Sequence, residues 1–220
     1  MKKFFWENLK SHNQRTALIE AETEASITYA ELEKVTDEIA EELLSEHKKL
    51  IFLYTTNTIL SLQAYIAALK STDAVLLLDS KLNEEIRSNL IDTYQPEIII
   101  SDGRSNIKGY EKKTISVLEN CFVKEETNGI KIHPALKVLL STSGTTGSPK
   151  LVRLSRENIQ SNAESIAQYL EIDENEKPIT TLPFNYSYGL SVINSHLLKG
   201  STIVLTEKTV FFKEFWNDFK

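Results

Sequence analysis

Cysteine is almost missing from this sequence, in which Cys121 is the only one among 220 residues. A single cysteine excludes a disulfide within the chain and a zinc site built from several thiolates. The expected location is therefore a reducing compartment, the cytoplasm. The four histidines are far apart in the sequence and have no metal-ligand spacing, so we expect no metal site from them.

Long hydrophobic runs and an excess of positive charge are also missing. No apolar run approaches the roughly 20 residues that a membrane-spanning helix needs, so we expect no membrane span. A formal net charge of -6 argues against broad binding to nucleic acid, which requires a basic surface. Hydrophobic residues at 41% and charged residues at 25% are ordinary values for a folded globular chain.

Two catalytic signatures are absent. The spacing G-x-x-x-x-G-K-[ST] of a P-loop NTPase does not occur, and no serine lies in the G-x-S-x-G turn of a triad hydrolase. Both classes are therefore disfavoured.

What the sequence does contain is an alternation of helical periodicity with short β-branched runs, which predicts an α/β fold with mostly parallel sheet(s) flanked by helices. Thr28 and Glu31 form a capping box that begins the first helix, Ser155 caps a later one, and Gly200 ends the last long one. Between the helices we expect strands at 50–54, 74–79, 97–101, 137–141, 151–154, 179–182 and 202–205.

Residues 102–134 are richer in Gly, Asn, Lys and Glu and hold only brief apolar runs. We expect a seam between two subdomains of the 1–220 unit there.

The most informative stretch joins the expected strands 137–141 and 151–154. Glycines let backbone N–H groups approach phosphate oxygens, hydroxyls donate further hydrogen bonds, and a lysine adds positive charge. By composition alone, the same residues would equally suit a flexible polar loop. The stretch consists of Thr142, Ser143, Gly144, Thr145, Thr146, Gly147, Ser148, Pro149 and Lys150.

The order S-G-T-T-G-x-P-K closely resembles the signature loop of the adenylate-forming superfamily, which includes acyl-CoA synthetases, luciferases and carrier-loading adenylation domains. Leu151 stands where that family usually has glycine, a departure that affects the returning strand more than the phosphate contacts. Three further segments resemble family segments in the same order, so the resemblance covers nearly the whole chain: 27–32 (ITYAEL), 65–79 (YIAALKSTDAVLLLD) and 182–190 (LPFNYSYGL).

The resemblance implies that this chain is the N-terminal part of the large, AMP-binding domain of an acyl-CoA synthetase-like fold. Residues 142–147 and Lys150 would hold the phosphates of ATP. Tyr186 stands at the family's histidine position and would line the acyl pocket, an unusual residue there. Gly189 belongs to the same segment, where we expect it to permit close packing more than to make a contact.

The implied reaction joins a small-molecule carboxylic acid to AMP at the expense of Mg·ATP, after which CoA or the phosphopantetheine of a carrier protein takes the acyl group. The family's later segments, with the adenine pocket, a Mg²⁺ ligand and the mobile domain, have no counterpart before Lys220. We therefore expect an incomplete enzyme, inactive alone and with no catalytic side chain of its own. Exposed apolar side chains near its end would favour self-association: Phe212, Phe215, Trp216 and Phe219.

Three other interpretations stay open from the sequence. An amino-acid-activating carrier ligase would have the same loop, and so would a non-catalytic nucleotide- or phosphate-binding module. A structural or interaction fragment would not bind ATP at all.

Overall fold

The computed structural model describes residues 3–101, 106–126, 130–141, 150–211 and 213–218. Two short 3₁₀ helices, Phe5–Glu7 and Leu9–His12, come first. The α-helices are α1 (Tyr29–Leu43), α2 (Ile59–Lys70), α3 (Glu84–Tyr94), α4 (Arg156–Tyr169), α5 (Ser187–Lys199) and α6 (Lys213–Asp218). The strands are β1 (Thr16–Glu20), β2 (Ser26–Thr28), β3 (Leu50–Thr55), β4 (Ala74–Asp79), β5 (Ile98–Ile100), β6 (Tyr110–Ile115), β7 (Leu118–Lys124), β8 (Val138–Ser141), β9 (Leu151–Leu154) and β10 (Ile203–Leu205).

Seven strands form the larger sheet, in the order β6-β7-β5-β3-β4-β8-β9. Its four central strands, β5, β3, β4 and β8, are parallel, as the βα alternation predicts. Antiparallel strands extend it on both sides, with β7 and β6 beyond β5 and β9 beyond β8. The expected α/β fold is thus confirmed, and its parallel part is the centre of the sheet.

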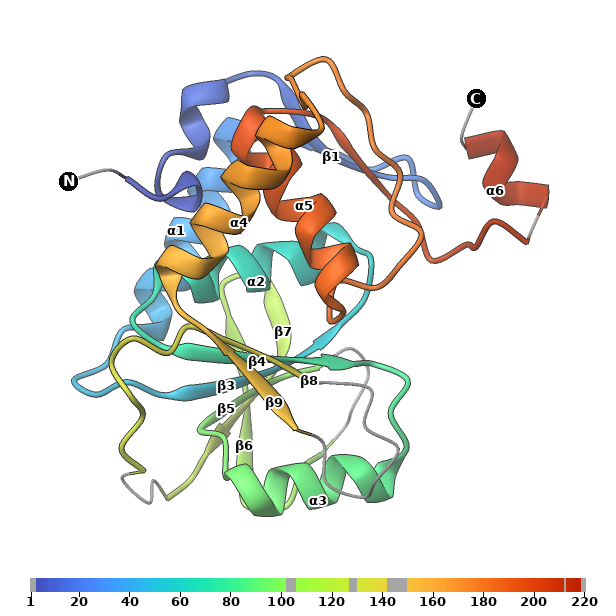
Figure 1. The fold of residues 1–220 in the computed structure, drawn as a ribbon. Helices are drawn as coiled ribbons and strands as arrows, with labels where there is room; N and C mark the ends of the chain where they lie inside the picture. The colour runs from blue at the N-terminus through green and yellow to red at the C-terminus, as the bar shows by residue number, and fades with distance from the viewer. Residues whose placement is uncertain (1–2, 102–105, 127–129, 142–149, 212, 219–220) are drawn as a thin grey trace.

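Helices cover both faces of this sheet (Figure 1), with α1, α2, α4 and α5 on one side and α3 on the other. Successive strand residues point to opposite faces, so β3 contributes to both cores. Ile51 and Leu53 belong to the core shared with α1 and α2. Phe52 and Tyr54 belong to the second core, together with Leu90 of α3. Its central strands are buried on both faces and are mostly apolar, with polar residues at the carboxyl ends of β3, β4 and β8: Thr55, Asp79 and Ser141.

The helix ends follow the signals in the sequence. The Thr28 side chain accepts from the backbone N–H of Glu31, and the Glu31 carboxylate accepts from the backbone N–H of Thr28. Ser155 forms the same reciprocal box with Asn158 at the start of α4. Gly200 ends α5 in the left-handed conformation, with φ of 78°. All three expected helix boundaries are therefore confirmed.

The segment expected to be a seam contains a β-hairpin, β6 and β7, which pairs with β5 at the edge of the large sheet. The sequence did not indicate these strands because β6 carries a run of exposed, mostly charged residues, Glu111 to Thr114, between two buried ends. A boundary between subdomains within 102–134 stays a prediction.

A smaller sheet has the order β10-β1-β2. β10 is parallel to β1, although the two are far apart in the sequence. The strand expected at 179–182 is reduced to a single bridge, in which Ile179 pairs with Val204. This small sheet places Glu20 and Glu207 near the carboxyl ends of the central strands of the large sheet.

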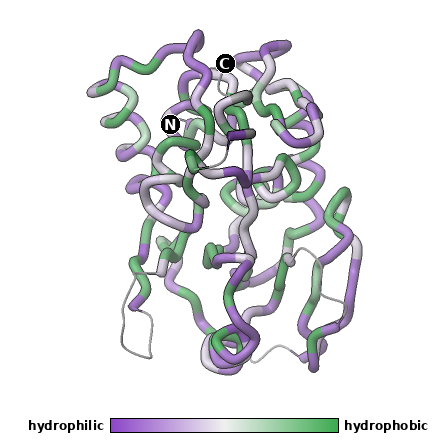
Figure 2. The backbone as a smooth tube through the Cα atoms, turned by 90° about the vertical axis from the view of Figure 1, so that its right-hand side faces the viewer, coloured by the Kyte–Doolittle hydropathy of each residue, from purple (hydrophilic) through white to green (hydrophobic). Residues whose placement is uncertain are grey.

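Hydrophobic and hydrophilic residues are interspersed along the backbone (Figure 2). Within the described ranges, no helix is both long and apolar enough to cross a membrane.

Candidate functional site

Two paired strands frame the predicted phosphate loop. β8 and β9 run antiparallel, with Ser141 opposite Leu151. Lys150 is exposed and directly precedes β9. Six of the predicted phosphate-binding residues lie outside the described residues, so their contacts stay a prediction: Thr142, Ser143, Gly144, Thr145, Thr146 and Gly147.

The loop begins at the carboxyl end of a parallel strand. β8 is parallel to β4, and β4 is parallel to β3, so these three strands end on the same edge of the sheet. Open α/β sheets bind their ligands outside this edge. The strand that leads into the phosphate loop therefore ends where a ligand site is expected.

Tyr186 lies at the same edge. It is the N-cap residue of α5, its side chain makes no capping hydrogen bond, and it is 44% exposed. It lines a cavity of about 710 Å³ together with Ser141 of β8 and Val152 of β9. The fold thus brings Tyr186 and the two ends of the phosphate-loop hairpin around one space.

Gly189 has a different place. A Cβ atom on Gly189 would lie 2.5 Å from the carbonyl oxygen of Pro183 and 2.8 Å from that of Leu182. The first turn of α5 therefore packs directly on the backbone that precedes Tyr186, and only glycine fits there. Gly189 lines a second cavity, of about 460 Å³, with Tyr188. Its contact with a substrate stays a prediction.

The cavity at Tyr186 has a neutral lining, and we call it the neutral cavity. Its apolar wall comes from β8, β9, α4 and α5: Leu140, Val152, Leu154, Ile159 and Leu190. Its polar wall consists of hydroxyl and amide side chains: Ser141, Asn158, Asn162, Ser187, Ser191 and Asn194. None of the described lining residues carries a formal charge at neutral pH.

Each amide oxygen of this wall already accepts a hydrogen bond. Asn158 Oδ1 accepts from the backbone N–H of Ser155, at 3.0 Å. Asn162 Oδ1 accepts from Ser191 Oγ, at 3.3 Å. Asn194 Oδ1 accepts from the phenol of Tyr65, at 3.2 Å. These amides also offer NH₂ donors to the cavity, and each oxygen keeps a second lone pair.

The Tyr65–Asn194 pair is held inside the protein. Tyr65 is fully buried in α2, and its ring packs against Phe184 with centroids 5.8 Å apart. Burial raises the pKa of the Tyr65 phenol well above its ordinary value, so this hydroxyl keeps its proton and donates. Asn194 itself is 3% exposed. A buried donor thus fixes which end of the Asn194 amide faces the cavity.

The sequence reasoning missed these amides, although it contained a signal for them. Ser187, Ser191 and Asn194 recur at spacings of four and three, and so share one face of α5. Asn158 and Asn162 are four apart on α4. What the sequence could not show is that these two polar faces meet.

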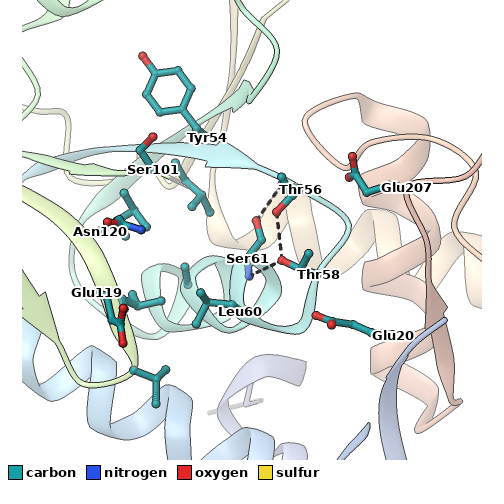
Figure 3. Close-up of a pocket in the computed structure, with 15 residues that line it drawn as sticks. Glu20, Tyr54, Thr56, Thr58, Leu60, Ser61, Ser101, Glu119, Asn120 and Glu207 are labelled. Atoms are coloured by element: carbon teal, nitrogen blue, oxygen red, sulfur yellow. Dashed lines mark hydrogen bonds between the residues drawn. The ribbon is translucent and has the colours of Figure 1, made fainter. Parts of the chain in front are cut away.

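A separate cavity of about 560 Å³ lies at the carboxyl ends of β3 and β5 (Figure 3). Of the predicted ATP- or substrate-binding residues that the structure describes, Lys150, Tyr186 and Gly189, none lines it. Three carboxylates do, those of Glu20, Glu119 and Glu207, and we call it the acidic cavity. Three neighbouring residues are joined by hydrogen bonds there: the Thr56 and Thr58 hydroxyls bond to each other, Ser61 Oγ accepts from the backbone N–H of Thr56, and Thr58 Oγ1 accepts from that of Ser61.

Two acidic side chains of this cavity fasten the small sheet to the large one. Glu20 Oε1 accepts from the backbone N–H of Ile59, at 2.7 Å, and Glu207 Oε1 accepts from that of Asn57, at 2.9 Å. The other oxygen of Glu207 lies 3.6 Å from Lys81 Nζ. The carboxylates of Glu20 and Glu207 therefore stabilise the fold through these hydrogen bonds.

The sequence also singles out Cys121 and four aromatic residues near the end of the chain. Cys121 is buried in β7, and burial raises the pKa of its thiol to about 12, which makes it a poor nucleophile. Phe215 is 2% exposed, so its expected exposure is wrong, whereas Trp216 is 49% exposed. Phe212 and Phe219 lie outside the described residues.

The sequence model of one family, described as AMP-binding enzyme, matches residues 5–220. The chain belongs to the AMP-binding enzyme family. The expected membership of the adenylate-forming superfamily is thus confirmed.

Characterised members of the AMP-binding family are similar over most of this chain. A 2-succinylbenzoate–CoA ligase of Staphylococcus epidermidis is 27% identical over 207 residues, which cover 93% of this chain and 43% of the relative. A D-alanine–D-alanyl carrier protein ligase of the same species is 24% identical over 214 residues, which cover 94% of this chain and 43% of the relative. The chain spans less than half the length of these relatives.

Solved structures confirm the acyl-CoA synthetase-like fold. The o-succinylbenzoate CoA synthetase of Bacillus subtilis, in complex with its acyl-adenylate intermediate, superposes with a TM-score of 0.73 at 25% identity, covering 94% of this chain and 56% of that one. The N-terminal domain of FACL13 from Mycobacterium tuberculosis has a TM-score of 0.75 at 16% identity and covers 99% of this chain and 60% of that one.

Proposed function

We propose that the protein to which this chain belongs activates a carboxylic acid with ATP. In the first step a carboxylate oxygen attacks the α-phosphorus, and the bond from that phosphorus to the bridging oxygen of the β-phosphate breaks. The products are an acyl-adenylate and pyrophosphate. In the second step a thiol attacks the acyl carbon and AMP leaves.

One observation carries this proposal. The phosphate-loop hairpin and Tyr186 border the same cavity, at the carboxyl edge of the parallel strands, in a chain that matches the AMP-binding family over its length. A loop that binds the phosphates of ATP, next to a cavity that binds an organic acid, would hold the two reactants close to each other. Holding both reactants in position removes much of the entropic barrier to their reaction.

We assign each residue a role in this reaction from the chemistry of its side chain and backbone. Residues 142–147 and Lys150 hold the terminal phosphates of ATP and offset the charge that develops on the leaving pyrophosphate. Tyr186 borders the acyl group. Mg²⁺ would accompany the ATP.

The acyl acceptor has two candidates. One relative of this chain is a CoA ligase and another is a carrier protein ligase, which supports a thiol acceptor, either that of CoA or that of a carrier's phosphopantetheine. We further propose that the protein works in the cytoplasm, in keeping with its lone buried cysteine. Self-association through exposed apolar side chains near the end, among them Phe211 at 92% exposure, is also proposed.

The test is ATP–pyrophosphate exchange with a panel of carboxylic acids. We expect residues 1–220 alone to give background exchange, because a grip on two phosphates does not align the α-phosphorus with the acid. The chain with its downstream polypeptide should support exchange. Robust exchange by the 220 residues alone would overturn the incomplete-enzyme interpretation.

A second measurement separates an enzyme from a binding module. If the complete protein binds Mg·ATP but exchanges no pyrophosphate with any acid, the non-catalytic module is correct. If neither chain binds ATP, the phosphate role of the loop is wrong, and a structural role replaces it.

A further inference from the structure

The neutral cavity presents an unusual balance of hydrogen-bonding groups. Each of its three amide oxygens already accepts one hydrogen bond, from Ser155, Ser191 or Tyr65, whereas the amide NH₂ groups can donate to a ligand in a space of about 710 Å³. A ligand that carries an acceptor can therefore use these donors.

Asn194 is the best placed of these donors. Asn194 is 3% exposed and lines the cavity, and its amide nitrogen has no hydrogen-bond partner among the described residues. This amide nitrogen can therefore donate to an acceptor on a ligand in the cavity. The orientation of the amide is fixed from behind by Tyr65, so a ligand does not have to order it.

The charge of the wall limits the ligand further. An ammonium group taken out of water needs a carboxylate to compensate for its charge, and no described lining residue carries a carboxylate. A second carboxylate needs a cation, because amide donors alone do not compensate for removing that charge from water. Neither a lysine nor an arginine is among the described lining residues. A neutral oxygen avoids both costs.

We propose that the neutral cavity selects carboxylic acids whose tail is uncharged and carries a hydrogen-bond acceptor, such as a ketone, ether or amide oxygen, which Asn194 binds. The inference rests on the proposed acid-activating function and narrows its substrate class. It disfavours tails with an ammonium group or a second carboxylate. Tyr65 acts as a positioning residue through Asn194.

The experiment titrates the 220-residue chain with three benzoates of similar size: 4-acetylbenzoate, terephthalate and 4-(aminomethyl)benzoate. The readout is the side-chain amide resonance of Asn194, identified by its loss in Asn194→Asp. The neutral acid should shift this resonance at millimolar concentration and bind at least about tenfold tighter than either charged acid. No shift with the neutral acid, or equal or tighter binding of terephthalate, overturns the proposal.

Variants test the mechanism. Asn162→Asp and Asn194→Asp each add a carboxylate to the wall and should turn the preference toward 4-(aminomethyl)benzoate. Asn162 is exposed, so its variant keeps the test valid if Asn194→Asp does not fold. Asn106→Asp, at an exposed position outside the cavity, should leave the ranking unchanged. An unchanged ranking in Asn162→Asp and in any Asn194→Asp protein that folds contradicts the proposal.

The Tyr65→Phe variant tests whether Tyr65 acts by orienting the Asn194 amide or only by packing its ring. The ring stays, but the donor that orients Asn194 is lost, so the preference for the neutral acid should narrow while the chain remains folded. If Tyr65→Phe prefers the neutral acid over the charged acids as strongly as the wild-type chain does, Tyr65 does not position Asn194.

Measurements of acid binding and of pyrophosphate exchange distinguish a failure of this inference from a failure of the proposed function. If the complete protein exchanges pyrophosphate but ranks the charged acids first, this inference is wrong and the proposed function stands. If binding follows the expected order but no acid supports exchange, the proposed function is wrong and the selectivity of the cavity stands.

Discussion

Two cavities lie at the carboxyl edge of the large sheet, and their polar groups are used in opposite ways. In the acidic cavity, Glu20 and Glu207 accept hydrogen bonds from backbone N–H groups and so join the two sheets. In the neutral cavity, the amide oxygens are used within the fold but the amide nitrogens face the space. The difference teaches that charged side chains around a cavity can serve the fold, so charge in a lining does not by itself indicate a ligand site.

The first comparison concerns two lysines, Lys150 at the predicted phosphate loop and Lys81 beside the acidic cavity. Lys150→Ala should weaken Mg·ATP binding by about 1.5–3 kcal/mol if the lysine makes a charge-assisted hydrogen bond to phosphate. Lys81→Ala, at the rim of the acidic cavity, should leave ATP affinity unchanged, because Lys81 pairs with Glu207. Calorimetric titration measures both. Equal losses in the two variants would mean that general surface charge, and no specific grip, attracts ATP.

A pair of glycines tests how Tyr186 is held over the neutral cavity. Gly189→Ala should lower the free energy of unfolding by about 3 kcal/mol, because its methyl group would overlap the Pro183 carbonyl. Gly109→Ala should cost only about 1 kcal/mol, since a Cβ there meets nothing within 4 Å and only the positive φ is unfavourable. Urea denaturation of both variants gives the comparison. A cost at Gly189 no larger than at Gly109 would show that the overlap is relieved by a small backbone shift.

These contrasts also show what the sequence could and could not predict. The capping boxes at Thr28 and Ser155, the left-handed Gly200 and the central strands were predictable because each depends on a few neighbouring residues. The β6–β7 hairpin was not, because its charged edge strand lacks an apolar pattern. The neutral lining was not either, since it depends on how α4 and α5 meet.

A third comparison places one substitution in each cavity. Glu20→Ala removes the acceptor for the Ile59 N–H and should lower the free energy of unfolding by about 1–2 kcal/mol. Ser191→Ala removes a hydroxyl at a half-buried position of the neutral cavity and should change it by less than about 0.5 kcal/mol. Thermal denaturation of the two variants distinguishes the cavity that supports the fold from the one that does not. A larger loss at Ser191 than at Glu20 would reverse that assignment.

The last comparison concerns the opposite, amino-terminal edge of the strands, where Lys137 is 1% exposed and donates to the carbonyl oxygens of Ser71 and Asp73, both at 2.7 Å. Burial lowers its pKa to about 7, with Lys48 and Arg156 adding to the shift and the Asp73 carboxylate opposing it.

The sign of the pH dependence follows from proton counting. Below pH 7 the folded and unfolded states both carry the proton on Lys137. Between about pH 7 and the ordinary lysine value of 10.5 the unfolded chain binds more protons, so stability rises with pH in this window. The free energy of unfolding, measured relative to that of Lys137→Met, should therefore increase by about 1 kcal/mol from about pH 7.5 to 8.5. The exposed Lys113→Met variant, whose lysine pairs with Glu111, should not alter the pH slope. If the free energy of unfolding has the same pH dependence in the wild-type chain and in Lys137→Met, Lys137 stays charged in the folded protein. The amino-terminal edge of the sheet would then contain a buried charge, whereas the neutral cavity at the carboxyl edge contains none among its described lining residues.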